Sequence, residues 1–266
     1  MPKDFQDKVV WITGASSGIG EAMAIDISKL NARIILSARR QEELERVKSL
    51  CSEDSEVEIL LLDLSDTGCL EEVARKVESI YGHIDILINN AGMSQRDTIL
   101  NTKPEVERRL MEINFFGCIA LSRYVLPKMI ERKSGHHVVV SSAVGLISVA
   151  RRSAYAASKH ALHGWYDSLR IEQYQNGIHV TLICPGYILT NLSYNAVKGD
   201  GSKQNALDST HEKGMAVEEF SRKAISAILR KKEEVYIGGL KEVFAIYLKR
   251  FLPGVYSRII RKVKVT

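Results

Sequence analysis

The chain has 266 residues, of which 45% are hydrophobic, and a formal net charge of +5. This length suits one large α/β domain or two small ones with a sizeable buried core, and no linker rich in Pro, Gly or Ser divides it. We therefore expect one domain. No basic-then-apolar leader and no uncharged apolar stretch of about eighteen residues is present, which argues against secretion and a membrane span. The four scattered cysteines are typical of reduced thiols, and we expect a cytoplasmic protein.

Apolar strands alternate regularly with helical stretches, which predicts a parallel sheet with right-handed crossovers. Strands are predicted over residues 8–13, 33–38, 57–62, 84–88, 138–140, 178–184 and 235–237. A first helix is predicted to end near residue 30. Four more helices are predicted over about residues 68–81, 102–131, 153–175 and 217–231.

The first strand runs into a glycine-rich turn that opens the first helix. Its residues are Gly14, Ala15, Ser16, Ser17, Gly18, Ile19 and Gly20. The glycines allow a tight turn and let backbone N–H groups approach a pyrophosphate, with the positive end of the helix behind it. The spacing differs from the Gly-x-Gly-x-x-Gly fingerprint, and a plain strand-to-helix turn is the alternative. Its position after the first strand favours a phosphate site.

The second strand ends about twenty residues beyond the glycines, where an acid would bind the adenosine ribose of NAD. Ala38, Arg39 and Arg40 stand there instead. Arg39 would offer a planar fork of donors to a 2′-phosphate, which indicates NADP(H) over NAD(H). Solvated arginines, or pairs with glutamates of the following helix, are the alternatives. After the third strand, Asp63-Leu64 would meet the adenine.

The fourth strand ends in Asn89-Asn90-Ala91-Gly92. A capping box at residues 102–105, with Pro at the first helical position, then starts the long helix that carries Asn114. Asn114 is a polar residue among apolar neighbours. A buried amide there needs partners, so a structural bond to a nearby carbonyl is the alternative to a catalytic role.

Three polar side chains, Ser142, Tyr155 and Lys159, form the candidate catalytic group. Tyr155 and Lys159 are four apart and project from one helix face about one turn apart. A phenol with a pKa of about 10 exchanges protons poorly at neutral pH unless a positive charge favours its phenolate, and Lys159 supplies that charge. Ser142 follows a buried strand, so its hydroxyl would face that helix. An ordinary surface pair is the alternative for Tyr155 and Lys159.

The sixth strand ends in Pro185-Gly186, and Thr190 is placed to bond a cofactor carboxamide. Residues 191–215 are polar and lack a clear period, so they are predicted to form a functional lid or a disordered loop. The paired histidines at 136–137, and those at 160 and 163, lack a third ligand at suitable spacing. We therefore expect no metal, and no nucleic-acid partner.

The C-terminal extension, residues 240–266, carries a net charge of +6. On a helix its apolar residues form two stripes separated by Pro253-Gly254, with lysines and arginines beside them. The stripes are Val243, Phe244, Tyr247, Leu248, Phe251 and Leu252, and then Val255, Ile259, Ile260 and Val263. Peripheral contact with a membrane surface is one interpretation. Packing on the same domain, on a partner subunit or over the substrate pocket is the other, and amphipathic helices usually face a core.

These motifs occur in the order and spacing of the short-chain dehydrogenase/reductases, which the chain resembles over roughly residues 8–238. The runs LSARRQEELERVKSL, AGMSQR, LPKMIERKSG and ASKHAL resemble the dehydrogenase/reductase member-seven subgroup. The resemblance implies a doubly wound, three-layer Rossmann domain over residues 1–239 with seven parallel strands in the order 3-2-1-4-5-6-7. It also implies a homodimer or homotetramer formed through the helices that bear Asn114 and Tyr155.

The resemblance further implies reversible hydride transfer between nicotinamide C4 and a carbonyl carbon. Tyr155 would exchange the proton, Ser142 would hold the substrate oxygen, Lys159 would bind the nicotinamide ribose, and Asn114 would hold a water. A catalytically silent dinucleotide-binding sensor or scaffold is the alternative function. An apolar lining would suit a lipophilic ketone or aldehyde; its expected residues are Val144, Leu146, Ile147, Val149 and Leu192.

Overall fold

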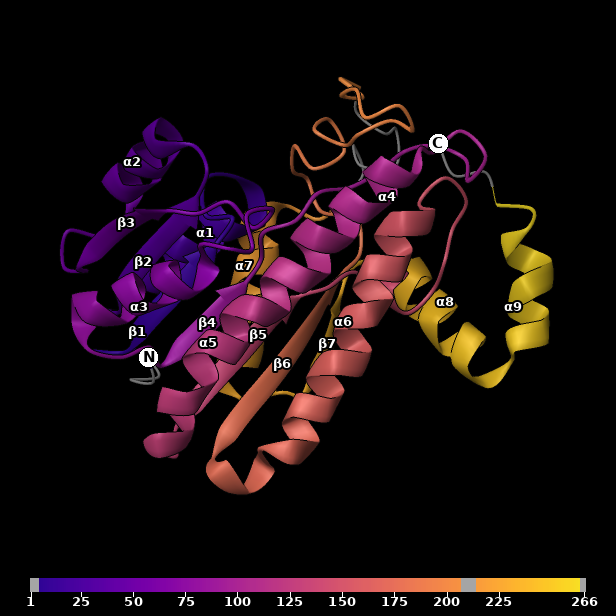
Figure 1. The fold of residues 1–266 in the computed structure, drawn as a ribbon. Coiled ribbons are helices and arrows are strands. Elements are labelled where there is room, and N and C mark those ends of the chain that lie inside the picture. The colour runs from indigo at the N-terminus through magenta and orange to yellow at the C-terminus, as the bar shows by residue number, and fades with distance from the viewer. Residues whose placement is uncertain (1–4, 207–213, 264–266) are drawn as a thin grey trace.

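Seven parallel strands form one sheet in the order β3-β2-β1-β4-β5-β6-β7 in the computed structural model, which describes residues 5–206 and 214–263. Helices cover both faces of this sheet (Figure 1), and the predicted doubly wound α/β fold is confirmed. The strands are β1 (Val9–Thr13), β2 (Arg33–Ala38), β3 (Val57–Leu61), β4 (Ile86–Asn89), β5 (Gly135–Val140), β6 (Ile178–Pro185) and β7 (Glu234–Ile237).

The central strand β1 is buried along its whole length. Its side chains alternate between faces, so Val10 and Ile12 join the apolar cluster on one side while Val9 and Trp11 join the cluster on the other. A strand covered on both faces needs a continuous apolar run and not an alternating one. The run in β1 therefore indicates a central position in the sheet.

Three helices pack on each face of the sheet. Helices α1, α2 and α7 share one apolar cluster, whereas residues of α3, α5 and α6 fill those on the opposite face. In Figure 1, α5 and α6 cross in front of the sheet and α1 and α7 lie behind it. The bounds are α1 (Gly18–Ser28), α2 (Gln41–Leu50), α3 (Leu70–Tyr81), α5 (Gly117–Glu131), α6 (Ser153–Glu172) and α7 (Val217–Leu229).

The long helix expected around Asn114 is present, but a π-helical turn interrupts it. It consists of α4 (Pro104–Met111), the π turn η1 (Glu112–Phe116) and α5. Pro104 occupies the first turn as predicted. The predicted capping box is wrong: Thr102 Oγ1 donates to the Thr98 carbonyl and accepts from Gln95 Nε2, each at 2.7 Å, because the buried Gln95 amide needs that partner.

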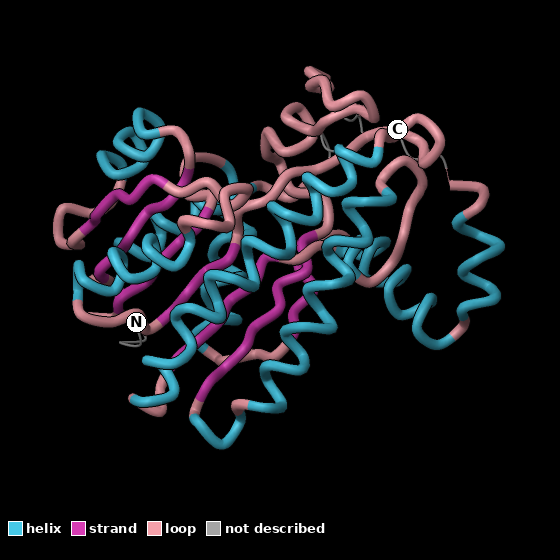
Figure 2. Tube along the Cα trace, viewed as in Figure 1, coloured by secondary structure: helices cyan, strands magenta, loops and turns pink. Residues whose placement is uncertain are grey.

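The longest connections follow β4, β5 and β6, at the carboxyl edge of the sheet, where Figure 2 shows them in pink. The short 3-10 turn η2 (Ala143–Gly145) lies directly after β5, and η3 (Tyr174–Asn176) follows α6. In the segment predicted as a lid, Val197 bridges to Gln95 and to Lys203, and its side chain is buried. This part is packed against the segment that follows β4. Residues 207–213 of the predicted lid lie outside the described residues.

The C-terminal extension forms a pair of helices, α8 (Leu240–Phe251) and α9 (Pro253–Ile260), beside the β7 edge (Figure 1). The break between them falls at Pro253, as predicted. Ile246 and Tyr256 are their buried side chains, and they pack against the turn that follows Ser142. None of the helices described in this structure is long and apolar enough to cross a membrane.

Candidate active site

A cavity of about 490 Å³ opens at the carboxyl edge of the sheet, where the connections after six strands meet. It brings together nearly all the residues that the sequence indicated. Those lining it are Gly14, Ser16, Ser17, Gly18, Ile19, Arg39, Arg40, Asp63, Leu64, Asn90, Ala91, Gly92, Ser142, Tyr155, Lys159, Pro185, Gly186 and Thr190. The predicted residues Gly20 and Asn114 lie behind this lining.

Tyr155 and Lys159 stand one turn apart on α6, and both are buried. The Nζ atom of Lys159 donates to the Val140 carbonyl at 2.8 Å and lies 5.9 Å from the centroid of the Tyr155 ring. Among the described residues this ammonium forms no ion pair with a carboxylate. Ser142 caps η2, where its Oγ accepts from Val144 N at 3.3 Å.

Asn114 lies on the π turn and is only 1% exposed. Its Oδ1 accepts from Met93 N at 2.8 Å, and its Nδ2 donates to the Met93 carbonyl at 2.9 Å and to Ser158 Oγ at 3.0 Å. These are the structural bonds that the sequence offered as the alternative. A Cβ at Gly92 would lie 3.1 Å from Asn114 Oδ1 and 3.7 Å from Lys159 Nζ, so both atoms face the same point.

The glycine-rich turn is built against the end of β4. Gly14 and Gly18 have φ angles of 66° and 59°, in the left-handed region that favours glycine. Asn90 Nδ2 donates to the carbonyl oxygens of Thr13 and Gly14, both at 3.1 Å. A Cβ at Gly20 would lie 2.5 Å from that Nδ2 atom. The turn therefore has no room for a side chain at position 20.

The surroundings of this turn fit the phosphates of a dinucleotide. Helix α1 begins at Gly18 with no side-chain cap from Ser17, so its first N–H groups and positive end point toward the cavity. The exposed guanidinium groups of Arg39 and Arg40 follow β2, and Arg40 Nη2 donates to Ser16 Oγ at 3.3 Å. Backbone donors and two cations around one turn suit anionic groups.

Asp63 lines the same cavity as these cations. Its Oδ1 accepts from the backbone N and the Oγ of Ser65, at 2.9 and 2.7 Å. Burial opposes ionisation of the carboxyl, but the Ser65 hydrogen bonds and the charges of Arg39 and Arg109 outweigh it and lower the pKa. The carboxylate is therefore ionised at neutral pH, as an acceptor for an amino group must be.

Sequence reasoning missed several lining residues and misplaced others. Arg109 and Ile113 line the cavity, and their four-residue spacing on the helix that carries Asn114 was the available signal. Of the expected apolar lining only Leu192 is correct. Val144 packs on α4 and Ile147 packs against α8 and α9, so neither reaches the cavity. The other newly found lining residues include Met93, Ile188, Asn195, Val197 and Lys203.

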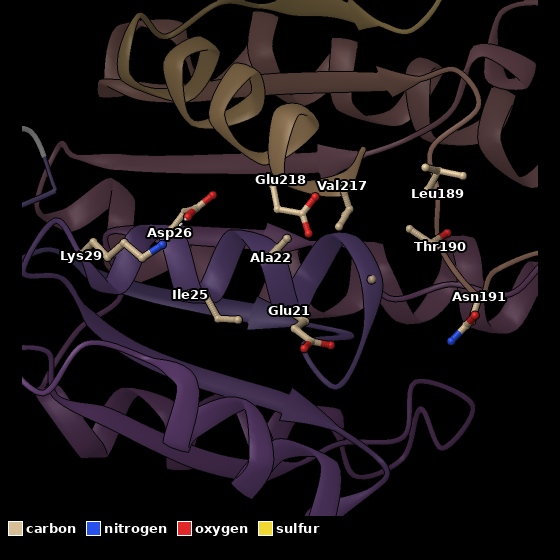
Figure 3. A pocket seen from close by; sticks show the side chains of 11 residues that line it. Glu21, Ala22, Ile25, Asp26, Lys29, Leu189, Thr190, Asn191, Val217 and Glu218 are labelled. Atoms are coloured by element: carbon tan, nitrogen blue, oxygen red, sulfur yellow. Dashed lines mark hydrogen bonds and ion pairs between the residues drawn. The ribbon is translucent and has the colours of Figure 1, made fainter. Parts of the chain in front are cut away.

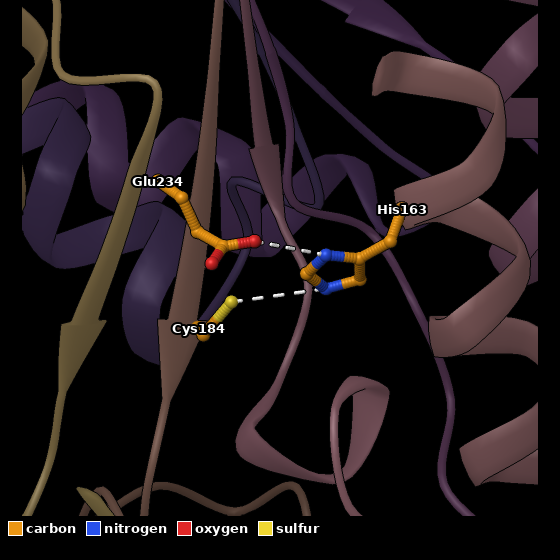
Figure 4. Close-up of side chains that lie close together, drawn as sticks. All are labelled: His163, Cys184 and Glu234. Atoms are coloured by element: carbon orange, nitrogen blue, oxygen red, sulfur yellow. Dashed lines mark hydrogen bonds and ion pairs between the residues drawn. The ribbon is translucent and has the colours of Figure 1, made fainter. Parts of the chain in front are cut away.

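His163 has neighbours that its sequence spacing did not reveal. Glu234 Oε2 lies 3.2 Å from its Nδ1, and Cys184 Sγ lies 3.8 Å from its Nε2 (Figure 4). The three side chains offer ligand atoms within 4.8 Å of one another, so third donors do exist near this histidine. A tetrahedral metal needs its ligands around one point, whereas these two approach different ring nitrogens. The geometry is that of a hydrogen-bonded chain.

A second cavity, of about 520 Å³, lies on the outer side of the glycine-rich turn between α1 and α7 (Figure 3). Gly18 and Thr190 line both cavities. Its acids are largely paired within the chain: Asp26 Oδ1 lies 2.9 Å from Lys29 Nζ, and Glu21 Oε1 lies 2.8 Å from Arg46 Nη1. It therefore adds no reacting group to the site.

The sequence profile of the family described as short chain dehydrogenase matches residues 8–201. The protein belongs to the short-chain dehydrogenase/reductase family of oxidoreductases, whose fold binds a nicotinamide dinucleotide. It is 42% identical over 263 residues to dehydrogenase/reductase SDR family member 7B of Danio rerio, covering 96% of this chain and 85% of that one. This likeness confirms the resemblance to the member-seven subgroup.

Solved structures support the same family. Levodione reductase superposes with a TM-score of 0.81 at 25% identity, covering 90% of this chain and 99% of the reductase. An alcohol dehydrogenase from the archaeon Thermococcus sibiricus, complexed with 5-hydroxy-NADP, superposes with a TM-score of 0.75 at 25% identity over 88% of this chain and 97% of its own.

Proposed function

We propose that this protein is an NADP(H)-dependent oxidoreductase that interconverts a carbonyl compound and a secondary alcohol. The observation that carries this proposal is the placement of Tyr155 and Lys159 on one face of α6, beside Ser142 and in the same cavity as the glycine-rich turn. A proton-exchanging phenol, a buried cation and a hydroxyl donor around one cavity are the groups that carbonyl reduction requires.

A nicotinamide dinucleotide held in this cavity would supply or accept the hydride. Tyr155 gives its phenolic proton to the substrate oxygen during reduction and takes it back during oxidation. Lys159 favours the phenolate and holds the nicotinamide ribose. Ser142 Oγ already accepts from Val144 N, so its own hydrogen is free to reach the substrate oxygen. Asn114 Oδ1 and Lys159 Nζ face a common point where a water would return protons from solvent.

We propose NADP(H) as the cofactor because Arg39 and Arg40, and no acid, follow β2. Gly14, Gly18 and Gly20 would approach the pyrophosphate, and Thr190 would bond the carboxamide. The archaeal neighbour that binds an NADP analogue is in keeping with this choice.

We propose a lipophilic carbonyl substrate on the basis of the apolar side chains that reach the cavity from the segments after β4 and β6. These are Met93, Ile188, Leu192 and Val197. The segment over residues 191–215 would act as the substrate lid. Within this segment, Val197 lines the cavity and is buried.

We also propose a homodimer or homotetramer formed through the helices that carry Asn114 and Tyr155. Phe116 on η1, Ile171 near the end of α6 and Tyr174 beyond it expose large apolar side chains on this side.

We propose a cytoplasmic location, because the four cysteines are free, which is in keeping with a reducing compartment.

The test is consumption of NADPH with a panel of steroid, retinoid, acyl and quinone carbonyls. Tyr155→Phe keeps the ring and removes only the hydroxyl, so turnover should fall by at least the roughly 10²- to 10⁴-fold credited to a positioned acid-base group. NADPH affinity should remain nearly unchanged. Tyr174→Phe is the matched control, because it also removes only a hydroxyl and lies beyond the end of α6 that is far from Tyr155.

Near-normal turnover by Tyr155→Phe would remove Tyr155 from the proposed mechanism. If the wild-type protein binds NADPH but turns over none of the carbonyls, the silent dinucleotide-binding sensor becomes the better account.

A further inference from the structure

The pair of helices α8 and α9 concentrates exposed apolar side chains. Of the eighteen large hydrophobic residues that are exposed in the described chain, eight lie between residues 240 and 263. Scattered single residues of this kind are normal on a soluble protein, but a cluster marks an interaction surface. We call the following set the apolar tail face: Leu240, Phe244, Tyr247, Phe251, Leu252, Val255, Ile259 and Val263.

The part of this face on α8 is a single stripe. Its members recur at intervals of four, three and four residues, so they project within a narrow sector of the helix. Tyr247 and Phe251 stack, with centroids 6.4 Å apart. Ile246, which anchors α8 to the domain, lies roughly 130° around the helix from the centre of the stripe. Tyr247 also meets the ring of Tyr236 on β7 edge-to-face, with centroids 5.9 Å apart, whereas Phe244 and Phe251 point away from the domain.

Cations flank the stripe on both sides. From the 100° step of an α-helix, Lys241 and Arg250 lie roughly 90° to either side of its centre. On and after α9, Arg258, Arg261 and Lys262 are also exposed. None of these five side chains forms an ion pair with another residue of the described chain, and residues 240–263 hold one acid, Glu242. The apolar tail face is thus bordered by uncompensated positive charge.

This charge decides between a second copy of the chain and a membrane surface. A two-fold contact would place the apolar tail face of one copy against the same face of another. The flanking cations of both copies would then meet, and like charges brought together in this way oppose association. An anionic lipid surface instead accepts the aromatic stripe in its interfacial region, while the lysine and arginine heads reach the phosphate groups.

We propose that α8 and α9 form a docking surface for an anionic membrane, with Phe244, Tyr247 and Phe251 inserted at the interface. The same helices hold the segment that follows Ser142. Lys249 Nζ donates to the Leu146 carbonyl at 2.7 Å, and Tyr256 OH donates to the Ser148 carbonyl at 3.0 Å. The helices of the docking surface therefore contact the segment that begins at the cavity residue Ser142.

Vesicle co-sedimentation of the full chain tests this surface. Wild-type protein should bind phosphatidylcholine vesicles that contain phosphatidylserine, and binding should weaken as salt rises. The double variant Phe244→Ser/Phe251→Ser removes two exposed rings, 65% and 70% accessible, and should lower the bound fraction at least about tenfold. The variant Arg258→Gln/Arg261→Gln should lose most of the preference for phosphatidylserine.

Leu50→Ser/Leu61→Ser is the matched control, because these side chains are 51% and 47% exposed and lie near the β3 edge, at the opposite end of the sheet from the tail. It should bind vesicles as the wild type does. Failure of the wild type to bind, or equal binding with and without phosphatidylserine, would overturn the proposal. If the wild-type protein does not bind vesicles, and Phe244→Ser/Phe251→Ser lowers the molar mass of the protein measured by sedimentation, a second copy of the chain covers this face. Vesicle binding needs neither cofactor nor substrate, so its absence would leave the proposed oxidoreductase function untouched.

Discussion

The Oγ atom of Ser141 lies 2.9 Å from Nε2 of His163. Ser141 directly precedes the cavity residue Ser142. The opposite ring nitrogen of His163 contacts Glu234, which also accepts a hydrogen bond from the Tyr236 hydroxyl. The hydrogen bond from His163 lowers the pKa of the Glu234 carboxyl, in spite of partial burial. This chain joins the end of β5 to α6 and β7, and it holds the backbone from which the Ser142 hydroxyl projects.

We expect Ser141 and His163 to stabilise the fold as a coupled pair. His163→Leu leaves the Ser141 hydroxyl with only the long bond to the Lys159 carbonyl, at 3.4 Å, and a poorly satisfied buried group costs up to about 1–3 kcal/mol. The two single variants and the double variant Ser141→Ala/His163→Leu should give a coupling energy of about 0.5–3 kcal/mol in urea unfolding. Ser141→Ala with His83→Leu, a remote histidine, should be additive. Additive effects for Ser141 and His163 would contradict the pairing.

Arg39 should determine the preference for NADP(H). A guanidinium 4 Å from a phosphate gains about 1 kcal/mol per unit charge even in water, so a dianionic 2′-phosphate gains about 2 kcal/mol, or more than tenfold in affinity. Arg39→Ala should raise the dissociation constant of NADPH by that factor and leave that of NADH nearly unchanged. Arg46→Ala, which breaks a surface pair with Glu21, is the control. Equal affinity of the wild type for both cofactors would refute the assignment.

Gly20→Ala should weaken cofactor binding, because the new methyl would collide with Asn90 Nδ2 and with the backbone of Gly14. The turn must then open, which displaces the N–H groups that approach the pyrophosphate. Gly164→Ala is the matched control: this helical glycine has no atom within 4 Å of an added methyl. Alanine there should stabilise the protein by about 0.5–1 kcal/mol. Fluorescence titration with NADPH measures the cofactor affinity of each variant, and unfolding in urea measures its stability. Equal NADPH affinities for the two variants would count against the packing argument.

His137 should make the protein sensitive to acid. The ring is fully buried and neither nitrogen has a hydrogen-bond partner among the described residues; burial lowers its pKa from 6.5 to about 4. As the pH falls, the unfolded chain binds a proton at His137 before the folded protein does. The free energy of unfolding therefore decreases between pH 6.5 and pH 4, by about 1.4 kcal/mol per pH unit. Between pH 7 and pH 5, the free energy of unfolding of His137→Leu should decrease by about 2 kcal/mol less than that of the wild type. Parallel stability curves for the two proteins would show that His137 does not carry this dependence.

The sequence predicted the elements best where burial leaves a continuous apolar run. The strand expected at 33–38 is β2 at those bounds, because both faces of the sheet are covered there. Tyr155 and Lys159 were also found readily, since a helix converts a spacing of four into spatial proximity. The glycine-rich turn was recognisable because its constraints are local.

Contacts between distant segments were not predictable in this way. Glu234 reaches His163 from β7, 71 residues further along the chain, and nothing in the sequence around either residue indicates the pairing. The apolar segment after Ser142 was expected to line the cavity, but Ile147 faces α8 and α9 instead. The hydrophobicity of such a side chain predicts that it will be buried. Tertiary packing determines the surface on which it packs.

The extension illustrates the same limit. The period of α8 predicted one apolar stripe, but the residue that anchors this helix is Ile246, which lies outside it. Leu248, a member of the predicted stripe, packs against the same cluster as Ile246, whereas Phe244 and Phe251 remain exposed.

The hydroxyl of Thr13 accepts hydrogen bonds from the backbone N–H groups of Asn90 and Ala91, at 3.1 and 3.2 Å. These partners are made 77 residues later, which at a translation rate of about 5–20 residues per second is a delay of roughly 4–15 s. During that interval β1 has only β2 available as a neighbour on the ribosome. A nascent chain that stalls before Asn90 would expose an apolar, one-sided β1 and an unfinished cofactor turn, which makes it a target for chaperones.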